Sequence, residues 1–180
     1  LKSEYAKKIL QNKPVVTISG SRNMWALAQD KMKVLLKAND AKLVGNIALV
    51  DRNINLISVV TVVDWMFSGL KRKAYGIFPL PGVSDKEIKE SNKFGTIIYN
   101  HFLENNYSNL QTDLVANGAV EFRHFLISMD KKANKMFKIW SKIILSNPNK
   151  KKILTKLFNY YLFVAIWVLS PIVHLIETIL

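Results

Sequence analysis

The chain has 180 residues, with 26 lysines and arginines against 13 acids and a formal net charge of +13, a length that suits one domain with a real core. It has no cysteine, which excludes disulfides, thiolate metal sites and a cysteine nucleophile, and its three histidines lack ligand spacing, so no metal site is predicted. The glycines are spaced too widely for the GxGxxG and P-loop motifs, and no GxSxG nucleophile elbow is present.

The first elements in chain order indicate an α/β unit. Residues 3–11 have the pattern of the end of an amphipathic helix, and because the chain opens without methionine or a signal peptide, we expect it to be the later part of a longer protein. Pro14 blocks a helix, and the β-branched run at 15–19 predicts a short strand. From Trp25 apolar residues recur at helical spacing, with polar residues such as Gln29 largely on the other side.

A second apolar run at 43–50 completes a strand–helix–strand unit, whose strands we expect to be parallel and joined by a right-handed crossover. In such sheets ligands bind beyond the carboxyl ends of the strands. Residues 19–25 follow the first strand and residues 51–53 follow the second. The candidate binding site is therefore expected at this edge of the sheet.

The middle of the chain is expected to be mainly helical. Residues 59–69 have the β-branching of a strand, but the length of the apolar run and its Gly69 C-cap favour a helix. The apolar loop at 77–82 either covers a flat ring bound near residues 20–25 or is a connection that packs over the core. Ser84 and Glu87 form a capping box for a helix running toward residue 104. Its expected core-facing residues are Ile88, Phe94, Ile97, Ile98 and Phe102.

Further on, Asn117-Gly118 predicts a helix end, and residues 120–127 predict a short extended piece. The next helix carries an apolar stripe and lies in a stretch, 131–156, with nine lysines and no acid. A lysine-rich amphipathic helix with aromatic side chains on its apolar side is typical of membrane surfaces. Nucleic acid is less favoured, because this stretch has no arginine, and no nucleic-acid partner is predicted; a merely solvated lysine face remains the other alternative.

The run at 157–176 has twenty residues without a formal charge, which is long enough to cross a bilayer. Asn159, Pro171 and His174 divide it into shorter parts that suit interfacial insertion better. A buried C-terminal helix of the domain is the alternative. We expect a cytoplasmic, membrane-associated protein. If the run spans the membrane, its lysine-rich flank places the residues before 157 on the cytoplasmic side.

Three segments carry a resemblance to a known family. They read GSRNMW at 20–25, AKLVGNIALVDR at 41–52 and GVSDKEIKESNKFG at 82–95. With them the chain resembles the second half of a flavodoxin-like protein of the NAD(P)H/FMN oxidoreductase family. More narrowly, it is similar to the flavodoxin-fold proteins labelled dialkylresorcinol condensing enzymes. The resemblance covers most of the chain. Its motifs are sequence patterns typical of the family and do not identify catalytic residues.

The resemblance implies an α/β fold: part of a doubly wound parallel sheet, followed by a helical, hydrophobic C-terminal region. The two predicted strands would be the fourth and fifth of the flavodoxin-like order. The first three, with the loop that binds the FMN phosphate, would be missing. We therefore predict a flavodoxin-like part at 1–110 and a membrane-associating extension at 111–180. Two parallel strands do not make a stable sheet, so either later segments supply strands or a partner half lies elsewhere.

The resemblance also implies an FMN-dependent oxidoreductase that uses NAD(P)H and a quinone-like, cyclic-ketone or resorcinol-type small molecule. The predicted cofactor-binding residues are Ser19, Gly20, Ser21, Arg22, Asn23, Met24 and Trp25. Main-chain N–H groups of 21–23 would bond the polar edge of the ring, Arg22 would stabilise the reduced flavin, and Trp25 or Met24 would stack on the ring. The ordinary alternatives are core packing for Trp25, a solvated loop for Arg22 and a turn at Gly20.

A second hypothesis belongs to a different class of protein. In it the chain is a non-catalytic, membrane-attached module, whose half-sheet is a scaffold and whose basic helix and hydrophobic tail carry the function. The missing phosphate loop favours this hypothesis. The sequence leaves a homo-oligomer open, and it predicts neither the substrate nor a catalytic residue.

Overall fold

The computed structural model of the chain describes residues 2–169 and 172. The chain divides into two compact units, which we name unit 1 (Leu1–Phe122) and unit 2 (Arg123–Leu180). Unit 1 is a mixed α/β structure with a two-stranded parallel sheet. The division falls after helix α6 (Leu110–Ala116), whereas the sequence places it at residue 110, before this helix. α6 belongs to unit 1 because it packs against the second strand.

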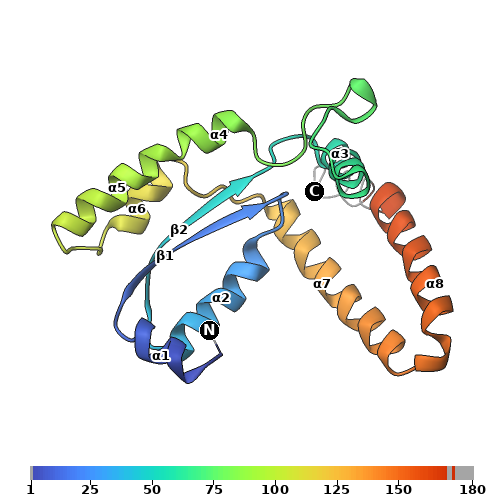
Figure 1. Cartoon of the computed structure of the whole chain (residues 1–180), viewed down its shortest axis with the longest axis horizontal. Helices are drawn as coiled ribbons and strands as arrows, with labels where there is room; N and C mark the ends of the chain where they lie inside the picture. The colour runs from blue at the N-terminus through green and yellow to red at the C-terminus, as the bar shows by residue number, and fades with distance from the viewer. Residues whose placement is uncertain (1, 170–171, 173–180) are drawn as a thin grey trace. The chain divides into compact units, whose positions relative to one another are not determined.

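The centre of unit 1 is a pair of parallel strands joined by a helix (Figure 1). β1 (Pro14–Ser21), α2 (Ala26–Ala38) and β2 (Lys42–Val50) confirm the predicted strand–helix–strand unit. Register runs from Pro14 opposite Lys42 to Ser21 opposite Val50, with one irregularity after Val15. A short helix, α1 (Glu4–Leu10), precedes β1, as the sequence predicts.

One face of the sheet is covered by α6 and by α5 (Asn92–Leu103). Ile47 of β2 packs there with the buried Phe94 and Leu114. A Cβ atom at position 45 would lie 2.9 Å from Leu114 Cδ1, so a larger residue at this point of β2 would force the Leu114 side chain of α6 to shift. The main core of unit 1 therefore lies between β2 and these two helices.

The opposite face is covered by α2 and carries a buried polar contact. Gln29 Nε2 donates a hydrogen bond of 2.8 Å to Thr17 Oγ1, which lies 3.0 Å from Asn46 Oδ1. Gln29 is only 4% exposed, so the prediction that it lies on the polar side of the helix is wrong. Both strands present polar side chains to this face, and buried polar groups require partners.

α3 (Asn55–Ser68) confirms the prediction of a helix over the β-branched segment. It ends at Gly69, whose φ of 70° is the left-handed C-cap conformation and whose N–H donates to Trp65 O at 2.8 Å. A single 3-10 turn, η1 (Ala74–Gly76), follows and packs against α3.

α4 (Asp85–Glu90) begins as its capping box predicts, with Ser84 Oγ accepting from Glu87 N at 3.2 Å. The predicted single helix is instead two, because it breaks at Ser91, whose Oγ donates to Ile88 O at 2.6 Å. Phe94, Ile97 and Ile98 pack into the core as expected. The prediction that Ile88 and Phe102 are buried is wrong. They are 48% and 62% exposed, because the core contacts of α4–α5 are confined to one side of α5.

The two edges of the sheet differ. On the outer edge of β2, Asn46 N donates to Gln111 Oε1 at 2.6 Å and Ala48 N to Ala119 O at 2.8 Å. Apart from its pairing with β2, β1 has no main-chain hydrogen bond from residues 15–20 to any described residue. Ile18 of β1 is 67% exposed. One edge of the sheet is thus closed by α6 and the turn after it, and the other is open.

His101 of α5 lies beside α6. Its Nδ1 is 2.7 Å from Asn106 O, and its Nε2 is 2.8 Å from Asp113 Oδ2. The contact with the Asn106 carbonyl, and then that with Asp113, raise the pKa of His101 above its ordinary value. The histidine has a structural pairing that links the two helices.

Unit 2 contains a pair of helices, α7 (His124–Leu145) and α8 (Lys151–Val164), joined through the 3-10 turn η2 (Pro148–Lys150) and followed by the π-helical turn η3 (Ala165–Leu169) (Figure 1). The predicted extended piece at 120–127 is wrong, because α7 begins at His124 and residues 120–123 form no strand. The apolar residues that follow position 124 fit the helical period that continues through α7.

An aromatic cluster joins the two helices of unit 2. Phe158 of α8 lies 5.4 Å from Phe137 and 5.5 Å from Trp140, measured between ring centroids, and Trp140 lies 5.5 Å from Tyr161. Within residues 2–169 and 172, no helix is both long and apolar enough to span a bilayer. The predicted apolar run at 157–176 continues beyond residue 169, and all of that part except Ile172 lies outside the described residues.

Candidate functional site

The loops after β1 and β2 meet, as the rule for parallel sheets predicts. Asp51 N donates hydrogen bonds to Ser21 O at 3.2 Å and to Arg22 O at 2.8 Å. Residues 19–25 are therefore held against the residues that follow β2. The prediction that all of them follow the first strand is wrong, because Ser19, Gly20 and Ser21 pair with β2 as the last residues of β1. This contact lies at the carboxyl edge of the sheet, where parallel α/β sheets bind ligands.

The carboxylate of Asp51 is the centre of this region. Its side chain is buried, with the residue 2% exposed, and it accepts three hydrogen bonds. Ser58 Oγ donates to Oδ2 at 2.7 Å, Gly82 N donates to the same oxygen at 3.2 Å, and Asn53 N donates to Oδ1 at 2.9 Å. Asp51 thus ties together the β1 loop, the start of α3 and the loop at 79–82.

The predicted cofactor-binding residues occupy different environments. Ser19 and Met24 are half-buried, Gly20 is exposed with open space beside it, and Ser21 Oγ donates to Met24 O at 3.3 Å. Burial lowers the pKa of the Arg22 guanidinium, and the negative charge of Asp51 opposes part of this shift.

Two residues of this loop are buried, Asn23 at 8% and Trp25 at 7% exposure. Trp25 packs on Ala48 and Val50 of β2, and its ring lies 5.4 Å from that of Phe122. It therefore has the core position that was the ordinary alternative for this residue. Of the two side chains expected to stack on a flat ring, only Met24 is partly accessible.

A cavity of about 410 Å³ opens beyond the carboxyl end of β2. Residues 51–53 form one wall, residues 79–85 form another, and Lys71 and Lys73 supply positive charge. None of residues 19–25 lines it. The sequence predicts the β2 end of this site, but no motif or spacing connects Lys71 and Lys73 to Asp51.

Arg52 closes the region on the side of α4. Its Nε donates to Glu87 Oε1 at 2.8 Å, and its Nη1 pairs with Glu121. Burial alone would lower the pKa of Arg52, but the bonds to these two carboxylates outweigh it and raise the pKa. The positive charge of Arg52 is thus directed to structural partners.

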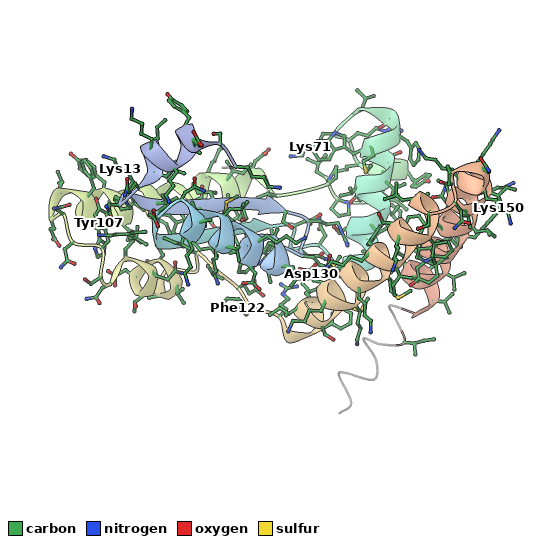
Figure 2. The ribbon with its side chains drawn as sticks, turned by 90° about the horizontal axis from the view of Figure 1, so that it is seen from below. Lys13, Lys71, Tyr107, Phe122, Asp130 and Lys150 are labelled. Carbon is green, nitrogen blue, oxygen red and sulfur yellow. The ribbon has the colours of Figure 1, made fainter. Side chains whose placement is uncertain are left out.

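Unit 2 offers a different kind of surface. No residue of unit 2 whose burial is described (123, 125–168 and 172) is buried, and α7, η2 and α8 together expose large apolar side chains and nine lysines. Figure 2 labels Lys150, one of these lysines, at the turn between the two helices. The most exposed apolar side chains are Leu145, Ile153, Leu157, Tyr160 and Phe163, at 74%, 64%, 50%, 63% and 63%.

Comparisons with known proteins give no relative. No protein-family model matches the chain, and neither does any curated protein or solved structure. Within residues 2–169 and 172, no group of three histidines or carboxylates is arranged to hold a metal ion. The function is therefore argued from the surfaces and contacts of the chain itself.

Proposed function

We propose that this protein binds the surface of anionic membranes through the α7–α8 helix pair. The observation that carries the proposal is the absence of any buried residue among residues 123, 125–168 and 172 of unit 2, in helices with exposed leucine, isoleucine and aromatic side chains. A helix pair that buries no core gains little stability from its own packing. We therefore expect the apolar sides of α7 and α8 to be covered by a partner outside the chain.

The charge of the helix pair favours lipid over nucleic acid as the partner that covers these sides. Residues 131–156 have nine lysines and no acid, and apolar side chains such as Ile143 and Ile153 are exposed between them. Apolar groups interleaved with lysine can enter the interface of a bilayer while the ammonium groups contact anionic head groups. Nucleic acid would use the charge but leave most of the apolar surface in water.

Sedimentation with vesicles tests the proposal. The intact protein should pellet with vesicles that contain phosphatidylserine, pellet less with pure phosphatidylcholine, and be partly released by high salt because screening weakens the lysine contacts. Protein that stays in the supernatant with both vesicles, at low and at high salt, would rule the proposal out. Binding to a DNA or RNA duplex in preference to anionic vesicles would favour the competing partner.

A second candidate function rests on unit 1. We propose that its β1–α2–β2 arrangement is part of a flavodoxin-like sheet and that the complete sheet serves an FMN-dependent oxidoreductase acting on a quinone-like, cyclic-ketone or resorcinol-type molecule. The asymmetry of the sheet favours this, since β2 is closed by Gln111 and Ala119 while β1 is open. Residues 15–20 of β1 include no charge, and an uncharged open edge is suited to receiving another strand.

The residues of this chain fit the flavin ring of FMN but not its phosphate. The 21–23 backbone would hold the polar edge of a flavin ring and Met24 would contact its face, whereas no Ser/Thr/Gly-rich phosphate loop follows either strand. The chain of 180 residues should therefore bind FMN far more weakly than micromolar in a fluorescence titration. A micromolar dissociation constant would show that the chain supplies a phosphate site of its own and would contradict the partial-sheet proposal.

A further inference from the structure

Unit 1 carries an apolar surface of its own, formed by the end of α3 and the loop that follows it. Five large side chains in this segment are far more exposed than is usual for their type. They are Met66, Phe67, Leu70, Tyr75 and Ile77, with exposures of 77%, 89%, 60%, 78% and 80%. We name this segment, residues 65–80, the α3 loop.

The backbone holds the tip of the α3 loop outward. Ala74 is fully buried and Pro81 is almost so, which anchors the loop on both sides of Tyr75 and Ile77. Tyr75 has a φ of 52°, a left-handed conformation that is uncommon for a residue other than glycine. Its ring meets Phe78 edge-on, with centroids 6.2 Å apart. A fixed conformation of this kind keeps two apolar side chains in water, which implies a use for them.

The charge of the segment indicates what covers it. Residues 64–85 include three basic side chains, which lie together at 71–73 between the apolar end of α3 and the loop tip, and two acids, Asp64 and Asp85, at the ends of the segment. Arg72 is held by Asp64, with N–O distances of 3.1 and 3.2 Å, and Lys71 (labelled in Figure 2) lies 4.0 Å from Asp85. Lysine and arginine beside exposed tyrosine and aliphatic groups are typical of the interface of an anionic bilayer.

We propose that the α3 loop is a second membrane-contact site, which inserts Phe67, Tyr75 and Ile77 into the interface of an anionic bilayer. The inference rests on the proposed membrane function of unit 2 and extends it to unit 1. A membrane is favoured over a protein partner because the segment combines exposed side chains of interfacial character with the basic side chains at 71–73. The candidate flavin function does not require this surface.

The absence of cysteine from the chain makes a direct test simple. Three single-cysteine variants, each labelled with an environment-sensitive fluorophore, report on separate surfaces. Ile77→Cys probes the α3 loop, Leu157→Cys probes α8, and Phe102→Cys, at an α5 position that is 62% exposed, is the control. With phosphatidylserine vesicles, the emission of the labels at 77 and 157 should shift to shorter wavelength and brighten, while the label at 102 should not change.

The pattern of the three labels separates the possible results. A shift at 157 without one at 77 overturns the α3 loop as a membrane site and leaves the proposed function of unit 2 standing. No shift at either position overturns both. A shift at 77 that needs only a higher protein concentration, and no vesicles, would mean that a second copy of the chain covers the loop, and it too overturns the inference.

A matched pair of variants measures the size of the effect. The triple change Phe67→Ser, Tyr75→Ser and Ile77→Ser should weaken vesicle binding by roughly tenfold or more, because each side chain loses apolar burial in the interface. The control change Tyr99→Ser, Phe102→Ser and Leu103→Ser removes residues of similar type from α5, where they are 58%, 62% and 64% exposed. Equal affinities for the two triple variants would overturn the inference.

Discussion

Replacement of the nine lysines of residues 131–156 by glutamine should lower the affinity for anionic vesicles by about a thousandfold or more. Lysines near an anionic surface contribute nearly independently to the binding free energy. An effect of this size is therefore expected even if only half of the nine lysines face the lipid. Glutamine has a helix propensity close to that of lysine, so α7 and α8 should be kept. Co-sedimentation at low salt, together with circular dichroism, measures both outcomes.

The weak binding that remains should depend less on salt, because nine of the charges that salt screens are gone while those at 71–73 remain. A control variant removes the same charge from unit 1, and like the first it lowers the formal net charge from +13 by nine to +4. Its lysines are Lys2, Lys8, Lys13, Lys31, Lys33, Lys37, Lys42, Lys89 and Lys93. It should stay bound to anionic vesicles. Equal loss in both variants would mean that total charge, and not the helix pair, drives the association.

The parts of the fold that the sequence predicted are those whose causes are local. Pro14 and the β-branched residues after it specify β1, Gly69 specifies the end of α3, and Ser84 with Glu87 specifies the start of α4. Each of these signals acts within a few residues of the feature that it determines. They were therefore readable without knowledge of the tertiary structure.

The errors have non-local causes or involve competing local bonds. Gln29 is buried because Thr17 and Asn46 lie opposite it. Its helical position shares a face with Trp25 and Leu36, and the prediction followed the polarity of glutamine instead of this position. The helix predicted up to residue 104 breaks where the Ser91 hydroxyl donates to a main-chain carbonyl. Serine forms such a bond in some helices and not in others, so the break could not be predicted from the residue type.

The candidate site was predictable in position but not in composition. The general rule that the carboxyl ends of parallel strands lie at one edge of the sheet was sufficient to predict that residues 19–25 and 51–53 lie close together. The partners of the Asp51 carboxylate include Ser58 and Gly82, which come from segments with no motif linking them to it. Trp25 fitted both a stacking role and a core role, and only its contacts with Ala48 and Val50 distinguish the two.

Replacement of Asp51 by alanine should destabilise unit 1 by about 3–5 kcal/mol. The change removes the acceptor for Ser58 Oγ and for the N–H groups of Asn53 and Gly82, and Ser58 is fully buried, so its hydroxyl would be left without its partner. The same contacts hold the start of α3 and the loop at 79–82 against the end of β2. Urea unfolding, followed through hydrogen exchange of the β1 and β2 amides, measures the loss.

Two further variants separate charge from connectivity at this position. Asp51→Asn keeps the shape and one acceptor oxygen, so its cost should be smaller, about 1–3 kcal/mol. Asp30→Ala removes a carboxylate of α2 that is 65% exposed and lies 3.5 Å from Lys33, and it should change stability by no more than about 0.5 kcal/mol. If Asp51→Ala cost no more than Asp30→Ala, the carboxylate would not hold the loops together. The candidate site would then lack the support that its geometry indicates.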